Sequence, residues 1–207
     1  MTWEEWRRLI ASLSGAMDEY FVLQDALNEG LTTADEIVSG FGGQVGLEMA
    51  YIDLTTDRDR YPLPRAYSRL VYVARLDNDA ATPWPLSPAM PTQFAEAVNR
   101  PARGGYWSPV GDNGIIIHPP PREDYDKGLQ VWGYPKHTCS PQVQPEHTIT
   151  CPPHSEDFVK WYAVNILASG ERKKRAAEQL QRAELTFRKH VEIPHAGVPP
   201  NIIREAF

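Results

Sequence analysis

The chain has 207 residues, of which 42% are hydrophobic and 23% are charged, and its formal net charge is −6. This composition is typical of a folded globular protein and excludes an intrinsically disordered one, while the negative charge argues against a main role in binding nucleic acid through its phosphates. The sequence has no apolar run long enough for a transmembrane helix and no signal-peptide core at its start. We therefore expect a protein that is made and assembled in a cytoplasm.

The first 47 residues predict a set of helices. Thr2 is a suitable N-cap, and Glu5 at the third helical position completes a capping-box pattern. Gly15 interrupts this first helix. A second, shorter helix is predicted over residues 18–27 and a third over residues 32–39, which several glycines then end.

From Glu48 the period of the apolar residues changes to two, which predicts strands. The segment Tyr61-Pro62-Leu63-Pro64 restarts extended structure, because a residue before proline avoids the helical region. Asn-Gly at 113–114 between two apolar runs predicts a hairpin. We expect residues 82–91 to be irregular and residues 92–99 to form a short helix. Strands are predicted at 48–55, 70–74, 106–110, 115–118 and 129–134.

Residues 155–191 predict two long helices with a break at Ser169-Gly170. Ser155 is the expected N-cap of the first helix, which is apolar over much of its circumference and should be central. Trp161 lies on this helix and is expected to be a core residue. The second helix is highly charged and carries one apolar stripe. Prolines in residues 192–207 then favour an extended C-terminal tail.

Together these elements predict an α+β fold. Its mainly helical core combines the N-terminal helices with the C-terminal helical hairpin, in residues 1–47 and 154–191. A block of antiparallel strands and hairpins in residues 48–153, with long loops, is inserted between them, and residues 192–207 form the tail.

One loop carries several side chains that bind metals in other proteins. Paired Cys-x-x-Cys knuckles are absent from it, and two consecutive prolines stiffen its end, so we expect neither a metal nor another cofactor. The sequence also lacks a phosphate-binding glycine loop, a nucleophile elbow and a paired-histidine metal motif. A small zinc-binding or hydrolytic enzyme remains the alternative from another class. Its site would be drawn from His137, Cys139, His147, Cys151 and His154.

The order of these features is similar to that in a known family. A helical segment precedes Tyr61-Pro62-Leu63-Pro64, the Asn113-Gly114 hairpin follows, a strand ends in Pro119-Pro120-Pro121, and a helix pair closes the chain. This order, over residues 45–191, resembles the head-to-tail adaptor (connector) proteins of tailed bacteriophages, especially short-tailed ones. The first 45 residues match that family only in being helical.

The resemblance implies a structural protein of the virion neck and not an enzyme. Such adaptors form a ring, usually a dodecamer, beneath the portal protein, where they extend the DNA channel and dock the tail nozzle or tail tube. DNA would pass through the ring without sequence-specific binding, and no membrane is involved. Another neck or tail-completion (nozzle) subunit is a second alternative within the same class.

Two sets of contact residues follow from this interpretation. The rigid hairpin is expected to contact a neighbouring subunit or the tail, through Trp107, Asp112, Asn113, Gly114 and Ile117. The apolar residues of the proline-rich tail need another surface to cover them, and the resemblance makes the portal that surface. The predicted portal-binding residues are Val198, Ile202, Ile203, Arg204 and Phe207.

Overall fold

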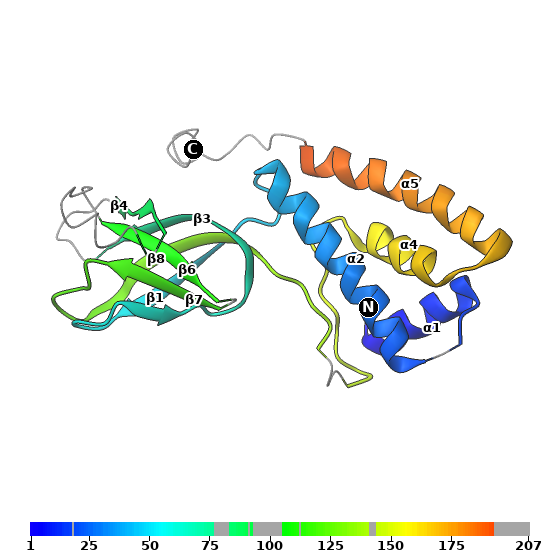
Figure 1. The fold of residues 1–207 in the computed structure, drawn as a ribbon, viewed down its shortest axis with the longest axis horizontal. Coiled ribbons are helices and arrows are strands. Elements are labelled where there is room, and N and C mark those ends of the chain that lie inside the picture. The colour runs from blue at the N-terminus through cyan, green and yellow to red at the C-terminus, as the bar shows by residue number, and fades with distance from the viewer. Residues whose placement is uncertain are drawn as a thin grey trace. The chain divides into compact units, whose positions relative to one another are not determined.

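The computed structural model describes residues 1–17, 19–76, 83–90, 92, 105–111, 113–140 and 144–192. It has the predicted α+β fold, and the chain divides into two units (Figure 1). Of the described residues, the helical unit contains Met1–Gly46 and Lys136–Glu192, and the β unit contains Leu47–Pro135. The β unit is therefore an insertion between two helical segments. The predicted end of the insertion at residue 153 is corrected to Pro135, because the loop after Pro135 packs with the helices.

The first helix, α1 (Trp3–Ser14), begins and ends at the predicted residues. The backbone N–H of Glu5 donates to Thr2 Oγ1 at 3.3 Å, and the N–H of Thr2 donates to Glu5 Oε2 at 2.8 Å, which completes the capping box. Gly15 ends the helix in the left-handed region, with a φ of 70°. Trp3, Trp6 and Ile10 form the buried face of α1.

Helix α2 (Tyr20–Phe41) replaces the two shorter helices that the sequence predicts. The prediction was wrong because Gly30 lies inside this helix instead of ending one. A β-carbon at Gly30 would be 3.2 Å from the carbonyl oxygen of Val159 in a neighbouring helix. The glycine therefore allows close helix packing, and its cost to helix propensity is offset by tertiary contacts.

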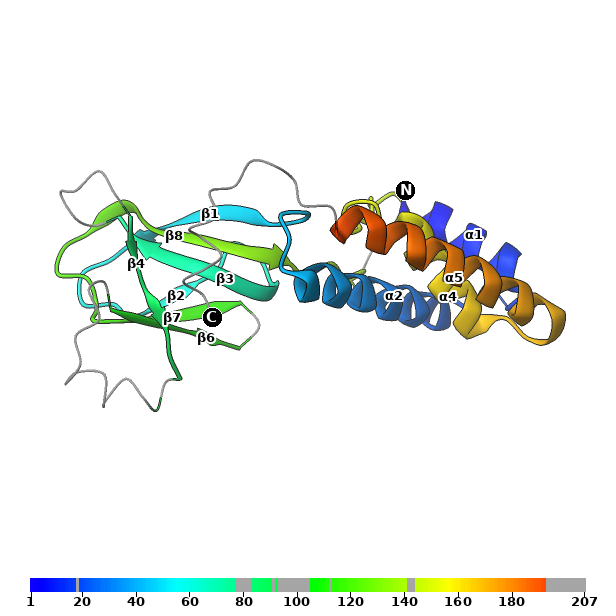
Figure 2. The same cartoon turned by 90° about the horizontal axis from the view of Figure 1, so that it is seen from above.

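Helices α4 (Glu156–Leu167) and α5 (Gly170–Glu192) form the predicted pair, with the break where it was expected. Helix α4 is central, in contact with α1, α2 and α5 (Figure 2). Ser155 is the N-cap residue of α4, as predicted, but its side chain makes no capping hydrogen bond: its Oγ is buried and donates to the carbonyl oxygen of Pro152 at 2.7 Å. Trp161 is half-buried and lines a groove, so its expected place in the core is corrected.

The β unit has two sheets. One has the order β1 (Glu48–Leu54), β8 (Tyr125–Pro135), β3 (Tyr67–Arg75) and β4 (Trp84–Pro85); the other has the order β2 (Arg60–Pro62), β7 (Gly114–His118), β6 (Tyr106–Val110) and β5 (Ser87–Pro88). Neighbouring strands are antiparallel except β5 and β6. The short strands β4 and β5 correct the expectation that residues 82–91 are irregular. The helix predicted over 92–99 lies outside the described residues, apart from Thr92.

Residues of both sheets share one apolar core. Tyr61 and Leu63 alternate inward in the segment that opens the strand block, while the prolines beside them are exposed. The Tyr61 hydroxyl donates to the carbonyl oxygen of Arg58 at 2.7 Å and fixes the turn before β2. The core contains Leu54, Tyr61, Leu63, Val73, Leu86, Trp107, Ile115, Ile117, Leu129 and Val131.

Candidate functional site

Helix α2 holds the loop that carries the candidate residues of the alternative zinc-binding or hydrolytic enzyme. Asp35 is only 4% exposed and accepts a hydrogen bond from the backbone N–H of His137 at 2.7 Å. The other carboxylate oxygen of Asp35 is 2.7 Å from Nδ1 of the His137 ring. Because an ionised carboxylate only accepts hydrogen bonds, this contact places a proton on Nδ1. Asp35 therefore holds both the backbone N–H and the Nδ1 atom of His137.

Cys139 is held on the same face of α2. Its backbone N–H donates to Asn28 Oδ1 at 2.7 Å, and Asn28 Nδ2 donates to the Cys139 carbonyl oxygen at 3.1 Å. Gln24 donates from Nε2 to the carbonyl oxygens of Cys139 and Ser140. Burial raises the pKa of the Cys139 thiol, and the hydrogen bond from Gln24 opposes this shift. These contacts hold Cys139 against α2 and indicate a structural role for this residue.

The middle of the loop is tied to the start of α1. The N–H of Trp3 donates to the carbonyl oxygen of His147 at 2.8 Å, and the N–H of Ile149 donates to the carbonyl oxygen of Met1 at 3.0 Å. These bonds satisfy an N–H of the first turn of α1, which has no partner within the helix. His147 thus lies at α1, apart from the residues that α2 holds.

Cys151 and His154 lie at the start of α4. Burial, with the nearby Glu156 carboxylate acting in the same direction, raises the pKa of the Cys151 thiol to about 12. Since the thiolate is the nucleophile and the metal ligand, the protonated thiol disfavours both roles at neutral pH. Within the described ranges, no cluster of three or more His, Cys, Asp or Glu side chains is placed to hold a metal ion. The five candidate residues of the loop are thus divided among α1, α2 and α4.

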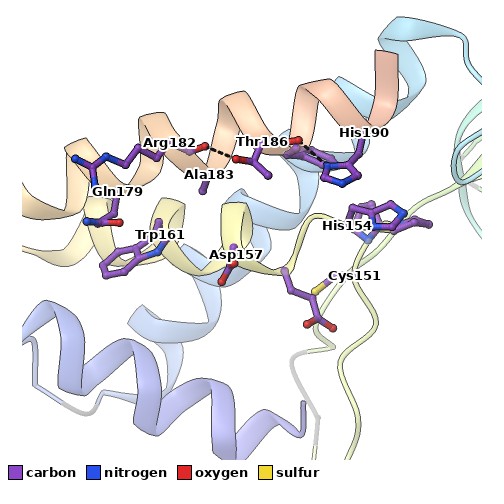
Figure 3. A pocket seen from close by; sticks show the side chains of 13 residues that line it. Cys151, His154, Asp157, Trp161, Gln179, Arg182, Ala183, Thr186 and His190 are labelled. Atoms are coloured by element: carbon purple, nitrogen blue, oxygen red, sulfur yellow. Dashed lines mark hydrogen bonds between the residues drawn. The ribbon is translucent and has the colours of Figure 1, made fainter. Parts of the chain in front are cut away.

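A groove of about 640 Å³ lies between α4, α5 and the loop before α4 (Figure 3). We call it the α4–α5 groove. The His154 ring stacks on the His190 ring, with centroids 4.9 Å apart and planes at 17°. His190 Nδ1 lies 2.8 Å from the carbonyl oxygen of Thr186, which requires a proton on Nδ1 and leaves Nε2 for another partner. The groove is lined by Cys151, Pro152, Pro153, His154, Glu156, Asp157, Trp161, Gln179, Arg182, Ala183, Thr186, Phe187 and His190.

A second groove, of about 480 Å³, lies between α2, α4 and α5. We call it the α2–α5 groove. Its apolar lining includes Phe41, and the Arg188 guanidinium lies 5.7 Å from the centre of the Phe41 ring. Arg188 also pairs with Glu184 through a 2.8 Å contact from Nε. Both grooves are lined by apolar and charged residues together.

The predicted contact hairpin is formed by β6 and β7, but two of its residues face inward. Trp107 is 6% exposed and Ile117 is fully buried in the core of the β unit. Their side chains are therefore unavailable for contact with another subunit, and this part of the prediction is corrected. Asn113 is exposed at the turn, and Gly114 follows it with a β-carbon position only 2.6 Å from the Val110 carbonyl oxygen. Asp112 lies outside the described residues.

The predicted portal-binding set also lies outside the described residues, since α5 ends at Glu192. This applies to Val198, Ile202, Ile203, Arg204 and Phe207. Their role stays a prediction.

Sequence reasoning missed the three residues of α2 that hold the loop. Gln24, Asn28 and Asp35 are polar residues on a helix face that otherwise carries Leu27, Leu31 and Val38. These polar side chains are spaced four and seven residues apart within an apolar helix face. Because a buried polar group needs a partner, this spacing could have predicted that they bind another segment of the chain. The sequence pattern gave no indication that the partner is the segment from His137 to Ser140.

Comparison of the sequence with protein-family models gave no match, and comparison with curated proteins gave no significant similarity. Among the helices in the described part of the chain, none is long and apolar enough to cross a membrane.

Proposed function

We propose that this protein is a head-to-tail adaptor of a tailed bacteriophage, a structural subunit and not an enzyme. It would form a ring, expected to be a dodecamer, beneath the portal protein. The ring would extend the DNA channel without sequence-specific contacts to DNA, and it would dock the tail nozzle or tail tube. The protein would be assembled in the host cytoplasm and would end in the neck of the virion.

The observation that supports this proposal most is the insertion of a two-sheet β unit between α2 and the α4–α5 pair. This is the order of elements on which the resemblance to the adaptor family rests. The segment Tyr61-Pro62-Leu63-Pro64 and the hairpin of β6 and β7 both have structural places in that insertion. The similarity to the adaptor family concerns the order of the structural elements. Binding to the portal and to the tail is part of the proposal.

Exposed apolar side chains give the proposal a second support. In the helical unit Phe21 is 69% exposed and Leu185 is 56% exposed; in the β unit Trp84 is 49% exposed and Met90 is 68% exposed. These side chains are available for contact in an assembly, where burying them would stabilise the association. The raised pKa of Cys151 and the bonded state of His137 weigh against the alternative enzyme that would use this loop.

The proposal is tested by mixing the full chain with purified portal rings of the same virus. We expect the chain to co-sediment with the rings, and electron microscopy of the complex should show an added ring below the portal, on the tail side. A ring placed elsewhere in the neck would instead favour a tail-completion subunit. Absence of binding to portal rings and to tail proteins would contradict the proposal.

The predicted role of the C-terminal tail has its own test. Replacing Ile202 and Ile203 by Asp should weaken co-sedimentation with portal rings, because the charged side chains cannot enter an apolar site. The matched control replaces Pro199 and Pro200 by Asp, which adds the same charge and keeps the apolar residues. Equal binding by both variants would remove the tail from the portal contact.

A further inference from the structure

Charge in the helical unit is separated between two helices. Helix α2 contains four acidic residues and no Lys or Arg. Helix α5 contains seven Lys or Arg residues and four Glu residues, which gives it a net charge of +3 without His190. The chain as a whole has a net charge of −6, so α5 is a basic element in an acidic protein.

Three acidic residues of α2 form a line along its exposed face, which borders the α2–α5 groove at Glu36. Asp25, Glu29 and Glu36 are exposed and are spaced four and seven residues apart, which places them on one helix face. Val22, which is 44% exposed, extends this face by one turn. Among the described residues none of the three acids makes an ion pair, and Glu29 receives a hydrogen bond of 3.4 Å from the Tyr162 hydroxyl. We call Asp25, Glu29 and Glu36 the acidic stripe.

The basic residues of α5 form a corresponding line. Arg175, Arg182 and Lys189 are exposed and are spaced seven residues apart, again on one face. Leu185 is 56% exposed between the second and third of them. None of these three cations has an ion pair within the described ranges, whereas Lys174 and Arg188 are paired with Glu171 and Glu184. We call Arg175, Arg182 and Lys189 the basic stripe.

The two stripes do not face each other within one chain. Helix α2 borders the side of α5 that carries Leu180, Glu184 and Arg188, where the α2–α5 groove lies. Arg182 lies on the other side of α5 and lines the α4–α5 groove, as Figure 3 shows. One molecule therefore leaves both stripes exposed, and a surface of opposite charge on another molecule can cover each of them.

The acidic and basic stripes also lie at similar heights along the two helices, and their charged residues have the same spacing. Helices α2 and α5 run in the same direction: Gly15, just before α2, lies under the Arg172 guanidinium, and a β-carbon at Gly43 would be 3.2 Å from the Val191 carbonyl oxygen. Glu29 and Glu36 therefore lie at about the levels of Arg175 and Arg182. Both pairs are seven residues apart, which is roughly 10.5 Å along a helix. Copies placed side by side at the same height would thus bring the pairs into register.

We propose that copies of this chain associate head to tail, with the acidic stripe of α2 on one copy against the basic stripe of α5 on the next. Because the two surfaces differ, the contact is heterologous, and repetition closes into a ring or extends as a filament. The charges set partner choice, direction and register, while Val22 and Leu185 add apolar contact. The biological setting of this interface rests on the proposed ring-forming function.

Charge reversal tests the interface in the full-length chain. One variant carries Glu29→Lys and Glu36→Lys, and the other carries Arg175→Glu and Arg182→Glu. Sedimentation velocity over a concentration series at low salt should detect self-association of the wild-type chain, and about 0.5 M salt should weaken it by screening. Each variant alone should associate at least roughly tenfold more weakly, because its stripes have the same sign.

Mixing the two variants is the decisive measurement. The first variant has two basic stripes and the second has two acidic stripes, so every contact in an alternating assembly is complementary. An equimolar mixture should recover the wild-type association. The matched controls are Glu123→Lys with Glu146→Lys, and Arg122→Glu with Lys136→Glu, which change net charge equally at exposed residues outside both stripes. These controls should associate like the wild type.

Three results would overturn the interface: a wild-type chain that stays monomeric at low salt, variants that associate like the wild type, or a mixture that fails to recover. Circular dichroism of each variant checks that the helices are retained. Portal co-sedimentation is measured separately, so that loss of the interface with retained portal binding contradicts this inference alone. Normal self-association without any binding to portal or tail would contradict the proposed function alone.

Discussion

The two units of the molecule hold their irregular segments in different ways. In the β unit most backbone groups are paired across strands, and turns such as the one before β2 close on a side chain of the common core, Tyr61. Among the described residues, the long loop after Pro135 in the helical unit joins neither sheet and forms one isolated backbone bridge, between Thr148 and Thr2. Side chains of α2 pair with its backbone at His137 and Cys139. An extended segment packed on helices needs such polar partners, because helices satisfy their own backbone groups.

This difference predicts different sensitivities. The β unit should depend mainly on apolar volume and on close backbone packing, whereas the helical unit should depend also on a few buried polar side chains. Single substitutions with matched controls can separate the two kinds of support.

The largest effect is expected in the core of the β unit. Trp107→Ala should lower the free energy of unfolding by about 3 to 5 kcal/mol, because it removes a large side chain that is 6% exposed. Trp84→Ala is the control: Trp84 is in the same unit but is 49% exposed, and its loss should cost no more than about 0.5 kcal/mol. Denaturant unfolding measures both. Similar costs for the two variants would contradict the assignment of Trp107 to the core.

A smaller effect is expected from added β-carbons at two glycines. Gly133→Ala in β8 should cost about 1 to 3 kcal/mol, since its β-carbon would lie 2.8 Å from the Arg69 backbone oxygen and 2.7 Å from the Tyr67 ring. Gly30→Ala in α2 meets Val159 only at 3.2 Å, and alanine recovers up to about 1 kcal/mol of helix propensity. We therefore expect Gly30→Ala to cost less. If Gly30→Ala lowers the free energy of unfolding more than Gly133→Ala does, close packing matters more in the helical unit than in the β unit.

The sequence predicted the elements that depend on local signals. The capping box at Thr2, the left-handed Gly15, the hairpin at Asn113-Gly114 and the break at Gly170 lie where the residue types require them. The α+β fold class followed from the change in apolar period at Glu48. Such features are encoded within a few residues.

The errors arose where distant contacts decide the structure. Gly30 resembles a helix end, and only its contact with Val159 explains why the helix continues. Trp107 and Ile117 were assigned to a contact surface because they flank an exposed turn, but strands alternate and these residues face inward. His137 and Cys139 were named only as members of the site of the alternative zinc-binding or hydrolytic enzyme, and nothing local in the sequence indicated that Asp35 and Asn28, a hundred residues away, hold them.

The polar support of the helical unit is tested at Asp35. Asp35→Ala removes the acceptor for the backbone N–H of His137 and should cost about 1 to 2 kcal/mol, because that donor is then left without its partner. Glu36→Ala is the control, since this neighbouring carboxylate is exposed and the free energy of unfolding of the monomer should change by no more than about 0.5 kcal/mol. Equal effects in thermal unfolding would show that the loop does not depend on α2.

The smallest effect on stability at neutral pH is expected for substitution of Cys151, so the test there measures the reactivity of its thiol. Its thiol should react with an alkylating reagent at pH 8 on the order of a thousandfold more slowly than the same cysteine in unfolded chain, because a pKa of about 12 leaves little thiolate. Mass spectrometry of peptides separates Cys151 from Cys139. Rapid labelling of Cys151 in the folded chain would contradict its raised pKa.

The pH dependence of stability gives a second measurement on the same thiol. The unfolded thiol loses its proton near pH 9, whereas the folded one keeps it to about pH 12. Between these values the folded state binds more protons, so the contribution of Cys151 to the free energy of unfolding is complete below pH 9 and falls as pH rises toward 12. Cys151→Ser should flatten this part of the stability curve, since serine does not titrate there. A curve that stays unchanged would mean that other groups, such as the buried tyrosines of the β unit, control alkaline unfolding.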